Sequence, residues 1–237
     1  MTMEVLQNKP QIEQARKELK KLGVPALDSS FVTLLRRLGL VKRMSVGDQV
    51  KSWDVLATLE FIKEHVAKDE AVLDIGCYAS EVPVALHKLG YTNISGADLN
   101  PDLQKMPYSD VINYVKTNFM HTQFENASFN AITATSVIEH GFEPEPLLKE
   151  MSRLLKNKGY FIASFDYWPE KIDTSKTKFF GMDWLIFSQE DVEDFVKKAS
   201  EYGLKPVGDM NFSAGDKVID CADKMYTFGW LVLQKEA

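Results

Sequence analysis

The sequence contains little cysteine and no long hydrophobic run. Two cysteines, Cys77 and Cys221, stand among 237 residues, which is too few for a disulfide scaffold, and they lack the CxxC spacing of a zinc site. No stretch approaches the roughly 20 consecutive apolar residues that a membrane helix needs, and the amino terminus has no apolar signal-peptide core. We therefore expect reduced cysteines, no bound metal and a cytoplasmic protein that does not contact a membrane.

Basic residues are in the minority, and they are unevenly distributed. The chain has 28 Lys and Arg against 34 Asp and Glu, for a formal net charge of -6. Residues 1–50 hold 9 basic and 5 acidic side chains (net +4), whereas residues 51–237 hold 19 and 29 (net -10). The acidic bulk argues against sequence-independent binding of nucleic acid, which requires neutralisation of phosphates. The basic residues Arg36, Arg37, Lys42 and Arg43 fit either a solvated helical face or contact with an anionic substrate or partner.

The hydrophobic fraction of 45% is that of a globular protein, and it excludes a disordered chain, collagen or a coiled coil. In the first part of the chain, apolar residues at helical spacing predict helices over residues 12–22, 29–40 and 52–66. We interpret residues 1–50 as a helical cap or lid and residues 51–237 as the main domain.

From about residue 70 onward, short apolar runs alternate with helical segments. The runs AVLDI, NISGADL, FNAITATSVI and YFIASF do not alternate between apolar and polar residues, which is typical of parallel strands covered on both faces. Helices are expected near 108–116 and over 189–202, the second with a capping box formed by Ser188 and Asp191. The last two strands, KPVGDMNF and MYTFGWLVLQK, are separated only by residues 213–223. That segment is too short for a crossover helix, so the two strands should form an antiparallel pair at one edge.

Two acidic residues end neighbouring strands of the predicted sheet. Asp74 lies in the strand that runs into Gly76, and Asp98 closes the next strand, 22 residues after Gly76. In a doubly wound sheet the crevice at the carboxyl ends of the strands binds ligands, and an acidic residue at this separation can accept both hydroxyls of a ribose. Asp74 could receive a cationic ammonium group there. Alternatively, Asp74 caps the next helix and Asp98 starts the turn at Asn100-Pro101.

The ordered set of these segments resembles the class I S-adenosylmethionine-dependent methyltransferases, and among them the small-molecule branch. The set comprises VLDIGC, ISGADL, FNAITATSVIEH, the helix that ends in KNKG and the strand YFIASF. The likeness covers roughly residues 50–237. It implies an α/β fold with a Rossmann-like sheet of seven mostly parallel strands, an antiparallel last strand and helices on both faces. It also implies S-adenosylmethionine as the cofactor.

The resemblance further implies a role for individual residues. The methionyl part of the cofactor would contact the loop that follows the first of these strands, with Asp74, Gly76, Cys77, Tyr78 and Ser80. The ribose would bind Asp98, and the adenine would lie near Leu99, Asn118 and Phe119. The methyl-transfer site would be lined by Ser136 and Val137, where the fourth strand ends.

Three positions depart from the pattern of the family. The loop usually reads GxGxG, but here Tyr78 and Ser80 replace the second and third glycines, so either the loop takes another path or the cofactor is displaced. Asn118 stands where aspartate is commoner, and its carbonyl can still accept a hydrogen bond from an amine. Asn130 replaces a usual aspartate, which we expect to affect a turn rather than the chemistry.

His140 follows Glu139 after the fourth strand and is our candidate general base, because an imidazole titrates in the useful range. It could equally be a loop histidine that orders the next turn. Residues 51–54 could touch the cofactor. The segment from Asp166 to Phe187 is rich in aromatic residues, which could wall an acceptor pocket or simply pack onto the sheet. The polar candidates in it are Asp166, Tyr167 and Asp183.

The sequence therefore predicts an enzyme that transfers a methyl group from S-adenosylmethionine to an oxygen or nitrogen of a small molecule, without a metal. The order of the parts favours sugars and secondary metabolites as acceptors. We expect a monomer or homodimer that binds no nucleic acid. Two alternatives stay open. A non-catalytic S-adenosylmethionine-binding module would explain the missing loop glycines, and a nicotinamide-dependent reductase would also use Asp98.

Overall fold

The computed structural model describes residues 2–25, 27, 30–38, 40 and 44–237. Its helices are α1 (Lys9–Lys21), α2 (Ser30–Arg37), α3 (Ser52–His65), α4 (Val82–Lys88), α5 (Pro144–Leu154) and α6 (Gln189–Glu201), and a 3-10 turn, η1, spans Leu103–Lys105. Its strands are β1 (Met3–Val5), β2 (Val72–Ile75), β3 (Ile94–Asp98), β4 (Asn113–Lys116), β5 (Phe129–Thr135), β6 (Leu155–Tyr167), β7 (Lys178–Phe179), β8 (Met182–Asp183), β9 (Leu204–Pro206), β10 (Ile219–Cys221) and β11 (Lys224–Lys235).

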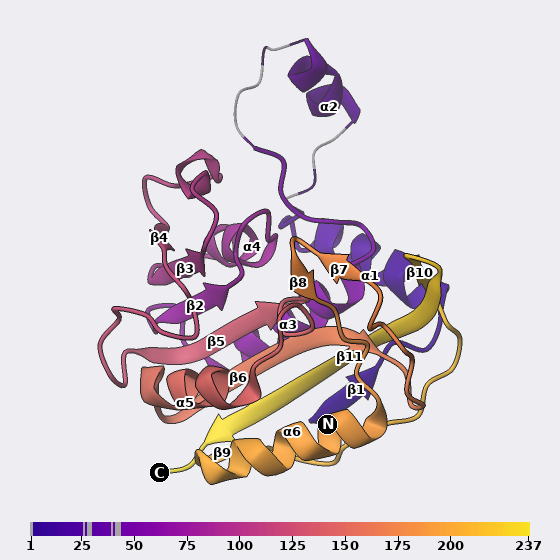
Figure 1. Ribbon diagram of the computed structural model, residues 1–237. Coiled ribbons are helices and arrows are strands. Elements are labelled where there is room, and N and C mark those ends of the chain that lie inside the picture. Colours follow the sequence, from indigo (N-terminus) through magenta and orange to yellow (C-terminus); the bar gives the residue numbers. More distant parts are fainter. Residues whose placement is uncertain (1, 26, 28–29, 39, 41–43) are drawn as a thin grey trace.

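One sheet contains most of the strands (Figure 1). Its order is β1-β11-β6-β5-β2-β3-β4, and the short strands β9 and β10 also pair with β11. Strands β2 to β6 run parallel to one another, whereas β11 runs antiparallel to β6, β1 and β9. The predicted, mostly parallel sheet with a reversed last strand is therefore confirmed, and so is the antiparallel pairing of the last two predicted strands, β9 and β11.

Helices cover both faces of this sheet (Figure 1). On one face α5 and α6 pack through buried side chains such as Leu148 and Phe195, and on the other face α3 and α4 do so through Leu59 and Leu86. Every residue of β2 is buried, which explains why its sequence does not alternate. The described part of the chain contains no helix that is both long enough and apolar enough to span a membrane.

The helix predicted near 108–116 is wrong. Asn113–Lys116 forms β4, which pairs with β3 at the edge of the sheet, and turns precede it. Val111 and Val115 have helical spacing, but Tyr114 is buried between more exposed neighbours, as in a strand with one covered face. Pairing with β3 and burial of Tyr114 therefore outweigh the local periodicity.

The amino-terminal segment is joined to the main domain. Strand β1 pairs with β11, and α1 packs against α3. The sequence did not predict β1, because three residues are too few to show a period. Helix α2 stands away from the rest of the molecule (Figure 1) and ends in Arg36 and Arg37, whereas Lys42 and Arg43 lie outside the described residues. The role of residues 1–50 as a lid stays a prediction.

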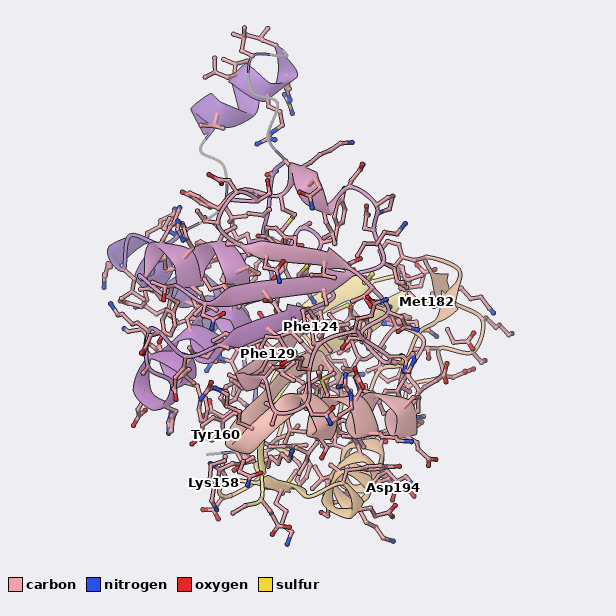
Figure 2. All side chains as sticks on the ribbon, turned by 90° about the vertical axis from the view of Figure 1, so that its left-hand side faces the viewer. Phe124, Phe129, Lys158, Tyr160, Met182 and Asp194 are labelled. Atoms are coloured by element: carbon pink, nitrogen blue, oxygen red, sulfur yellow. The ribbon has the colours of Figure 1, made fainter. Side chains whose placement is uncertain are left out.

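The parallel strands direct their carboxyl ends to one edge of the sheet. In Figure 2, Lys158 and Tyr160, near the start of β6, lie well apart from Met182, which belongs to the hairpin that follows the end of β6. The loops after β2, β3, β5 and β6 all emerge on the side of this hairpin, so residues far apart in the sequence can meet there.

Candidate cofactor and acceptor site

The loop between β2 and α4 has a backbone in which glycine is needed at one position. Gly76 has a φ of +63° and Ala79 a φ of +64°. A Cβ at Gly76 would overlap the side chain of Val137, so only glycine fits there. Tyr78 is not among the residues with positive φ. The replacement of the second family glycine by Tyr78 therefore needs no strained backbone.

Asp74 presents an unpartnered oxygen beside this loop. Its side chain is buried, and its Oδ1 accepts a hydrogen bond of 2.5 Å from Thr133 Oγ1. Its Oδ2 has no hydrogen-bond partner among the described residues. Burial raises the pKa of Asp74 to about 7, although the hydroxyls of Thr133 and Ser80 oppose that shift. A carboxylate in this position can receive an ammonium group from a ligand.

Asp98 bridges two loops at the end of β3. Its Oδ2 accepts a hydrogen bond of 3.0 Å from the amide of Tyr78, and its Oδ1 accepts one of 2.8 Å from the amide of Asn100. Asp98 therefore does order the turn at Asn100. Each oxygen keeps further acceptor capacity, so this contact is compatible with binding of ribose hydroxyls.

The remaining residues predicted for the cofactor differ in what they can offer. The thiol of Cys77 is buried against Gly96 of β3, and burial raises its pKa, so only its backbone can face a ligand. Leu99 and Asn118 are exposed and Phe119 is half-buried, as expected for a rim that covers an adenine. The carbonyl oxygen of Asn118 accepts a hydrogen bond of 2.9 Å from the amide of Met120.

Ser136 connects the end of β5 to the start of α3. It has a φ of +52°, and its hydroxyl accepts a hydrogen bond from Lys51 Nζ. The same ammonium group lies 3.8 Å from the centroid of the Phe228 ring. Lys51 therefore lies beside the predicted methyl-transfer position.

Three buried carboxyl groups, which we name the carboxylate cluster, surround this lysine: Asp54, Glu139 and Asp166. Their exposed fractions are 0%, 1% and 4%. Asp54 Oδ2 accepts a hydrogen bond of 2.8 Å from Ser164 Oγ, and Asp166 Oδ2 accepts one of 2.8 Å from Trp184 Nε1. Neither oxygen of Glu139, nor Oδ1 of Asp166, has a hydrogen-bond partner among the described residues. Three of the six carboxylate oxygens in the cluster are therefore buried without a donor.

Burial raises the pKa of every member of the carboxylate cluster. The pKa of Asp54 rises to about 6. The pKa of Glu139 lies well above its ordinary value because of burial first and the neighbouring Asp166 carboxylate second. Burial also raises the pKa of Asp166, against the effect of Trp184 and Tyr226. The ammonium group of Lys51 lowers all three values without cancelling the effect of burial.

His140 lies next to the cluster and is held neutral. Burial, and then the charge of Lys51, lower its pKa to about 4. Its Nδ1 has no hydrogen-bond partner among the described residues, and its ring lies 5.6 Å from that of Phe179 and 5.9 Å from that of Phe180. A neutral imidazole can accept a proton, but the low pKa makes it a weak base. Its role as general base stays a prediction.

The aromatic residues of the segment after β6 have two different surroundings. Trp184 and Phe187 are buried and pack onto the sheet, whereas Phe179 and Phe180 border His140. Of its polar candidates, only Asp166 belongs to the cluster. The hydroxyl of Tyr167 donates a hydrogen bond of 2.9 Å to the carbonyl of Phe212, and Asp183 is exposed beside Lys178.

Sequence reasoning assigned no role to Glu139. The one available signal is a glutamate within the otherwise apolar end of FNAITATSVIEH. The other groups of the cluster come from α3 and β6, and no local pattern shows that these segments meet. Residues 51–54, expected near the cofactor, do reach this end of the sheet through Lys51 and Asp54.

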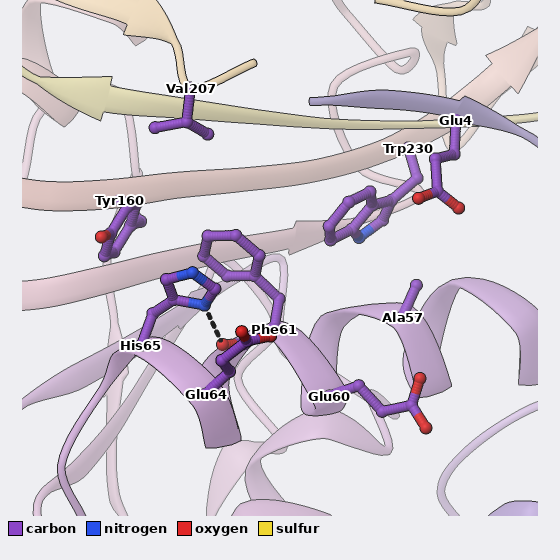
Figure 3. A pocket seen from close by; sticks show the side chains of 9 residues that line it. All are labelled: Glu4, Ala57, Glu60, Phe61, Glu64, His65, Tyr160, Val207 and Trp230. Atoms are coloured by element: carbon purple, nitrogen blue, oxygen red, sulfur yellow. Dashed lines mark hydrogen bonds between the residues drawn. The ribbon is translucent and has the colours of Figure 1, made fainter. Parts of the chain in front are cut away.

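A separate groove lies near the amino-terminal end of β6 (Figure 3). It has a volume of about 520 Å³ and lies between α3 and the strands β1, β6 and β11. Aromatic rings of Phe61, His65, Tyr160 and Trp230 line it, with three glutamates around them. None of the residues predicted for the cofactor or for catalysis lines this groove.

Comparison with known proteins agrees with this geometry. Residues 73–163 match the family model described as a methyltransferase domain. No curated protein matches the chain. The matched segment runs from β2 to the middle of β6 and thus contains the Gly76 loop, Asp98, Ser136 and Glu139.

Several solved structures have the same fold. Geranyl diphosphate C-methyltransferase from Streptomyces coelicolor, in complex with Mg²⁺, geranyl diphosphate and S-adenosylhomocysteine, is 13% identical, with a TM-score of 0.57 over 80% of this chain and 84% of its own. A provisionally named sarcosine dimethylglycine methyltransferase from Galdieria sulphuraria is 15% identical, with a TM-score of 0.57 over 94% of this chain and 98% of its own. A SAM-dependent methyltransferase from Methanosarcina mazei is 12% identical, with a TM-score of 0.54 over 74% and 97%.

The domain match and the shared fold agree with each other. The mostly parallel sheet and the reversed last strand are those that the sequence resemblance implied. Residues 73–163 thus match a methyltransferase domain, and the chain has the fold of S-adenosylmethionine-dependent methyltransferases.

Proposed function

We propose that the protein transfers a methyl group from S-adenosylmethionine to an oxygen or nitrogen atom of a small molecule, without a metal ion. The observation that carries the proposal is the pair of strand-end carboxylates around the Gly76 loop. Asp74 has an unpartnered oxygen on one side of it, and Asp98 holds the Tyr78 amide on the other. An ammonium group and a ribose are the ligand parts that such a pair suits.

The residues of the chain would bind and orient the cofactor. Asp74 would hold the ammonium of the methionyl part, the loop amides from Cys77 to Ser80 would lie along it, and Asp98 would accept the ribose hydroxyls. Ser136 and Val137 would border the reacting methyl group. When bound, the cofactor supplies an electrophilic methyl group on a sulfonium, so the protein must align an acceptor lone pair and remove a proton.

The proposal of a small-molecule acceptor rests on the buried side chains around Lys51. The carboxylate cluster and the aromatic ring of Phe179 can enclose a small molecule, and sugars or secondary metabolites are the classes that we favour. For a hydroxyl acceptor, His140 would act as general base. The net charge of -6 argues against a nucleic-acid substrate, and we expect the protein to work in the cytoplasm. Displacement at a sulfonium requires alignment and proton removal, for which no metal is needed.

Calorimetric titration tests the cofactor half. S-adenosylhomocysteine should bind and NAD should not. Asp98→Ala should weaken binding of S-adenosylhomocysteine about 10- to 100-fold, because hydrogen bonds to a charged group contribute about 1.5–3 kcal/mol. Asp102→Ala, at the start of η1, is the matched control and should bind normally. Unchanged affinity of Asp98→Ala would refute the ribose assignment, and binding of NAD alone would refute methyl transfer.

Turnover tests the acceptor half. Labelled S-adenosylmethionine should methylate a compound in metabolite fractions of the native cell, and a chelator should leave the rate unchanged. Loss of turnover with the chelator would show that a metal is required. This control is needed because the geranyl diphosphate enzyme was crystallised with Mg²⁺. A bound cofactor without any turnover would favour the non-catalytic alternative.

A further inference from the structure

The carboxylate cluster contains more negative charge than the protein compensates. Asp54, Glu139 and Asp166 are all at least 96% buried, and Lys51 is the cation whose charge acts on each of them. If all three carboxyl groups ionise, the group has a net charge of -2. Ionised carboxylates without a partner are costly to bury.

The shortage of donors is concentrated on Glu139. Asp54 accepts hydrogen bonds through both oxygens, from Ser164 and the Val55 amide, and Asp166 accepts one from Trp184. Neither oxygen of Glu139 has a donor among the described residues. The groups that face Glu139 electrostatically are Asp166, Lys51 and Asp54. Among the described residues, two carboxyl groups and one cation thus act on a carboxylate whose oxygens can accept up to four hydrogen bonds.

Glu139 lies on the predicted acceptor side of the site. It follows Ser136 by three residues, and Ser136 is bonded to Lys51. Its own backbone carbonyl accepts a hydrogen bond of 2.9 Å from the amide of Leu185, in the aromatic segment that covers the site. The cluster therefore lies between the predicted methyl-transfer position and the segment that would enclose an acceptor.

We propose that the methyl acceptor is an amine, that its ammonium form binds between Glu139 and Asp166, and that Glu139 takes its proton before methyl transfer. This inference rests on the proposed function. An ammonium ion brings both the positive charge and the N–H donors that the cluster lacks. A hydroxyl brings one donor and no charge, and an anionic acceptor would add to the negative charge.

The proposed reaction balances in two steps. An N–H bond of the ammonium breaks, the proton goes to a Glu139 oxygen, and the electron pair stays on nitrogen. The amine nitrogen then uses that pair to form a bond to the methyl carbon, while the carbon–sulfur bond breaks and its electrons stay on sulfur. The products are a methylated ammonium ion, a neutral thioether and a protonated Glu139, which later gives its proton to solvent.

A matched pair of probes tests this proposal by binding alone. Benzylamine and benzyl alcohol differ only in the amine and hydroxyl groups, and their ring suits an aromatic wall. Each is titrated calorimetrically into protein saturated with S-adenosylhomocysteine. We expect benzylamine to bind at least 10-fold more tightly than benzyl alcohol, and Glu139→Gln to remove that preference without changing the affinity for S-adenosylhomocysteine.

The controls separate charge recognition from damage to the fold. Glu143→Gln, an exposed glutamate before α5, should keep the full preference for benzylamine. Asp166→Asn should reduce the preference and serves as the second variant if Glu139→Gln does not fold. Equal affinities for the two probes in the wild type, or an unchanged preference in both variants, would overturn the proposal. Failure of the wild type to bind S-adenosylhomocysteine would instead refute the proposed function on which it rests.

Discussion

Glu139 and Glu150 are buried to nearly the same extent, at 1% and 5% exposure, but their surroundings are opposite. Glu150 accepts hydrogen bonds from Arg153 and from both the amide and the hydroxyl of Thr122, at 2.7–2.9 Å. The carboxylate of Glu139 accepts none from the residues that the structure describes. A carboxylate that only stabilises the fold is surrounded by donors, whereas one left without them has no stabilising purpose and points to a ligand.

The pKa values follow the same division. Burial disfavours ionisation of Glu150, but the hydrogen bonds from Arg153 and Thr122 outweigh it and lower the pKa to about 2. For Glu139, burial and the Asp166 carboxylate act in the same direction and raise the pKa. The type of residue and its degree of burial therefore do not determine its protonation, and the number of donors does.

Glu81 is a second buried carboxylate with partners, and it lies beside the cofactor loop. Arg16 of α1 reaches it with two hydrogen bonds, of 2.7 Å and 2.9 Å, and also donates to Ser52 Oγ at 2.9 Å. This ion pair fastens the amino-terminal helix to the starts of α3 and α4. Like Glu150, Glu81 is therefore a buried carboxylate that is paired with an arginine.

The largest expected effect comes from removal of that cation. Arg16→Met should reduce the free energy of unfolding by about 3–5 kcal/mol, because it removes one member of a buried, hydrogen-bonded ion pair. Urea denaturation measures the change. Lys17→Met, at an exposed position of the same helix, is the control and should stay within about 0.5 kcal/mol of the wild type. A loss below about 1 kcal/mol for Arg16→Met would show that the pair is not a structural fastening.

Smaller changes in stability, of opposite sign, are expected when Glu150 and Glu139 are each replaced by glutamine. Glu150→Gln should reduce the free energy of unfolding by about 1–3 kcal/mol, because the charge that Arg153 and Thr122 hold is lost. Glu139→Gln should increase it at pH 7, because a neutral amide replaces a carboxyl group whose ionisation is opposed by burial. Urea denaturation of both variants gives the comparison. Equal destabilisation by the two substitutions would remove the distinction on which the acceptor proposal depends.

The sequence predicted most of the fold because its central strands are buried on both faces. The lack of alternation in VLDI identified β2 as a parallel strand, and the short segment before β11 identified the reversed pair. Prediction failed at the edges of the sheet. Strand β1 has three residues, and β4 has a helix-like spacing that only pairing with β3 overrides.

In the candidate site, too, some features could be predicted from the sequence and others could not. The convergence of Gly76, Asp74 and Asp98 at one edge of the sheet was predictable, because it follows from a local pattern at the ends of two successive strands. The carboxylate cluster was not, because Asp54, Glu139 and Asp166 belong to segments that meet only in the folded sheet. Among the described residues, Glu139 has no hydrogen-bond donor because of how these segments pack together, and no local pattern in the sequence indicates it.

The most direct test of the central claim is the pH dependence of stability in the wild type, Glu139→Gln and Glu150→Gln. The folded state raises the pKa of Glu139 above the unfolded value of about 4.3, so it binds more protons than the unfolded state above that pH. Its contribution to stability therefore falls as pH rises, and the advantage of Glu139→Gln over the wild type should grow between pH 5 and 7 by about 1.4 kcal/mol per unit at most. The folded state lowers the pKa of Glu150 to about 2, so its contribution is present above about pH 4.3 and is lost as pH falls toward 2. An advantage of Glu139→Gln that stays constant or shrinks from pH 5 to 7 would contradict the claim that Glu139 is buried without a partner.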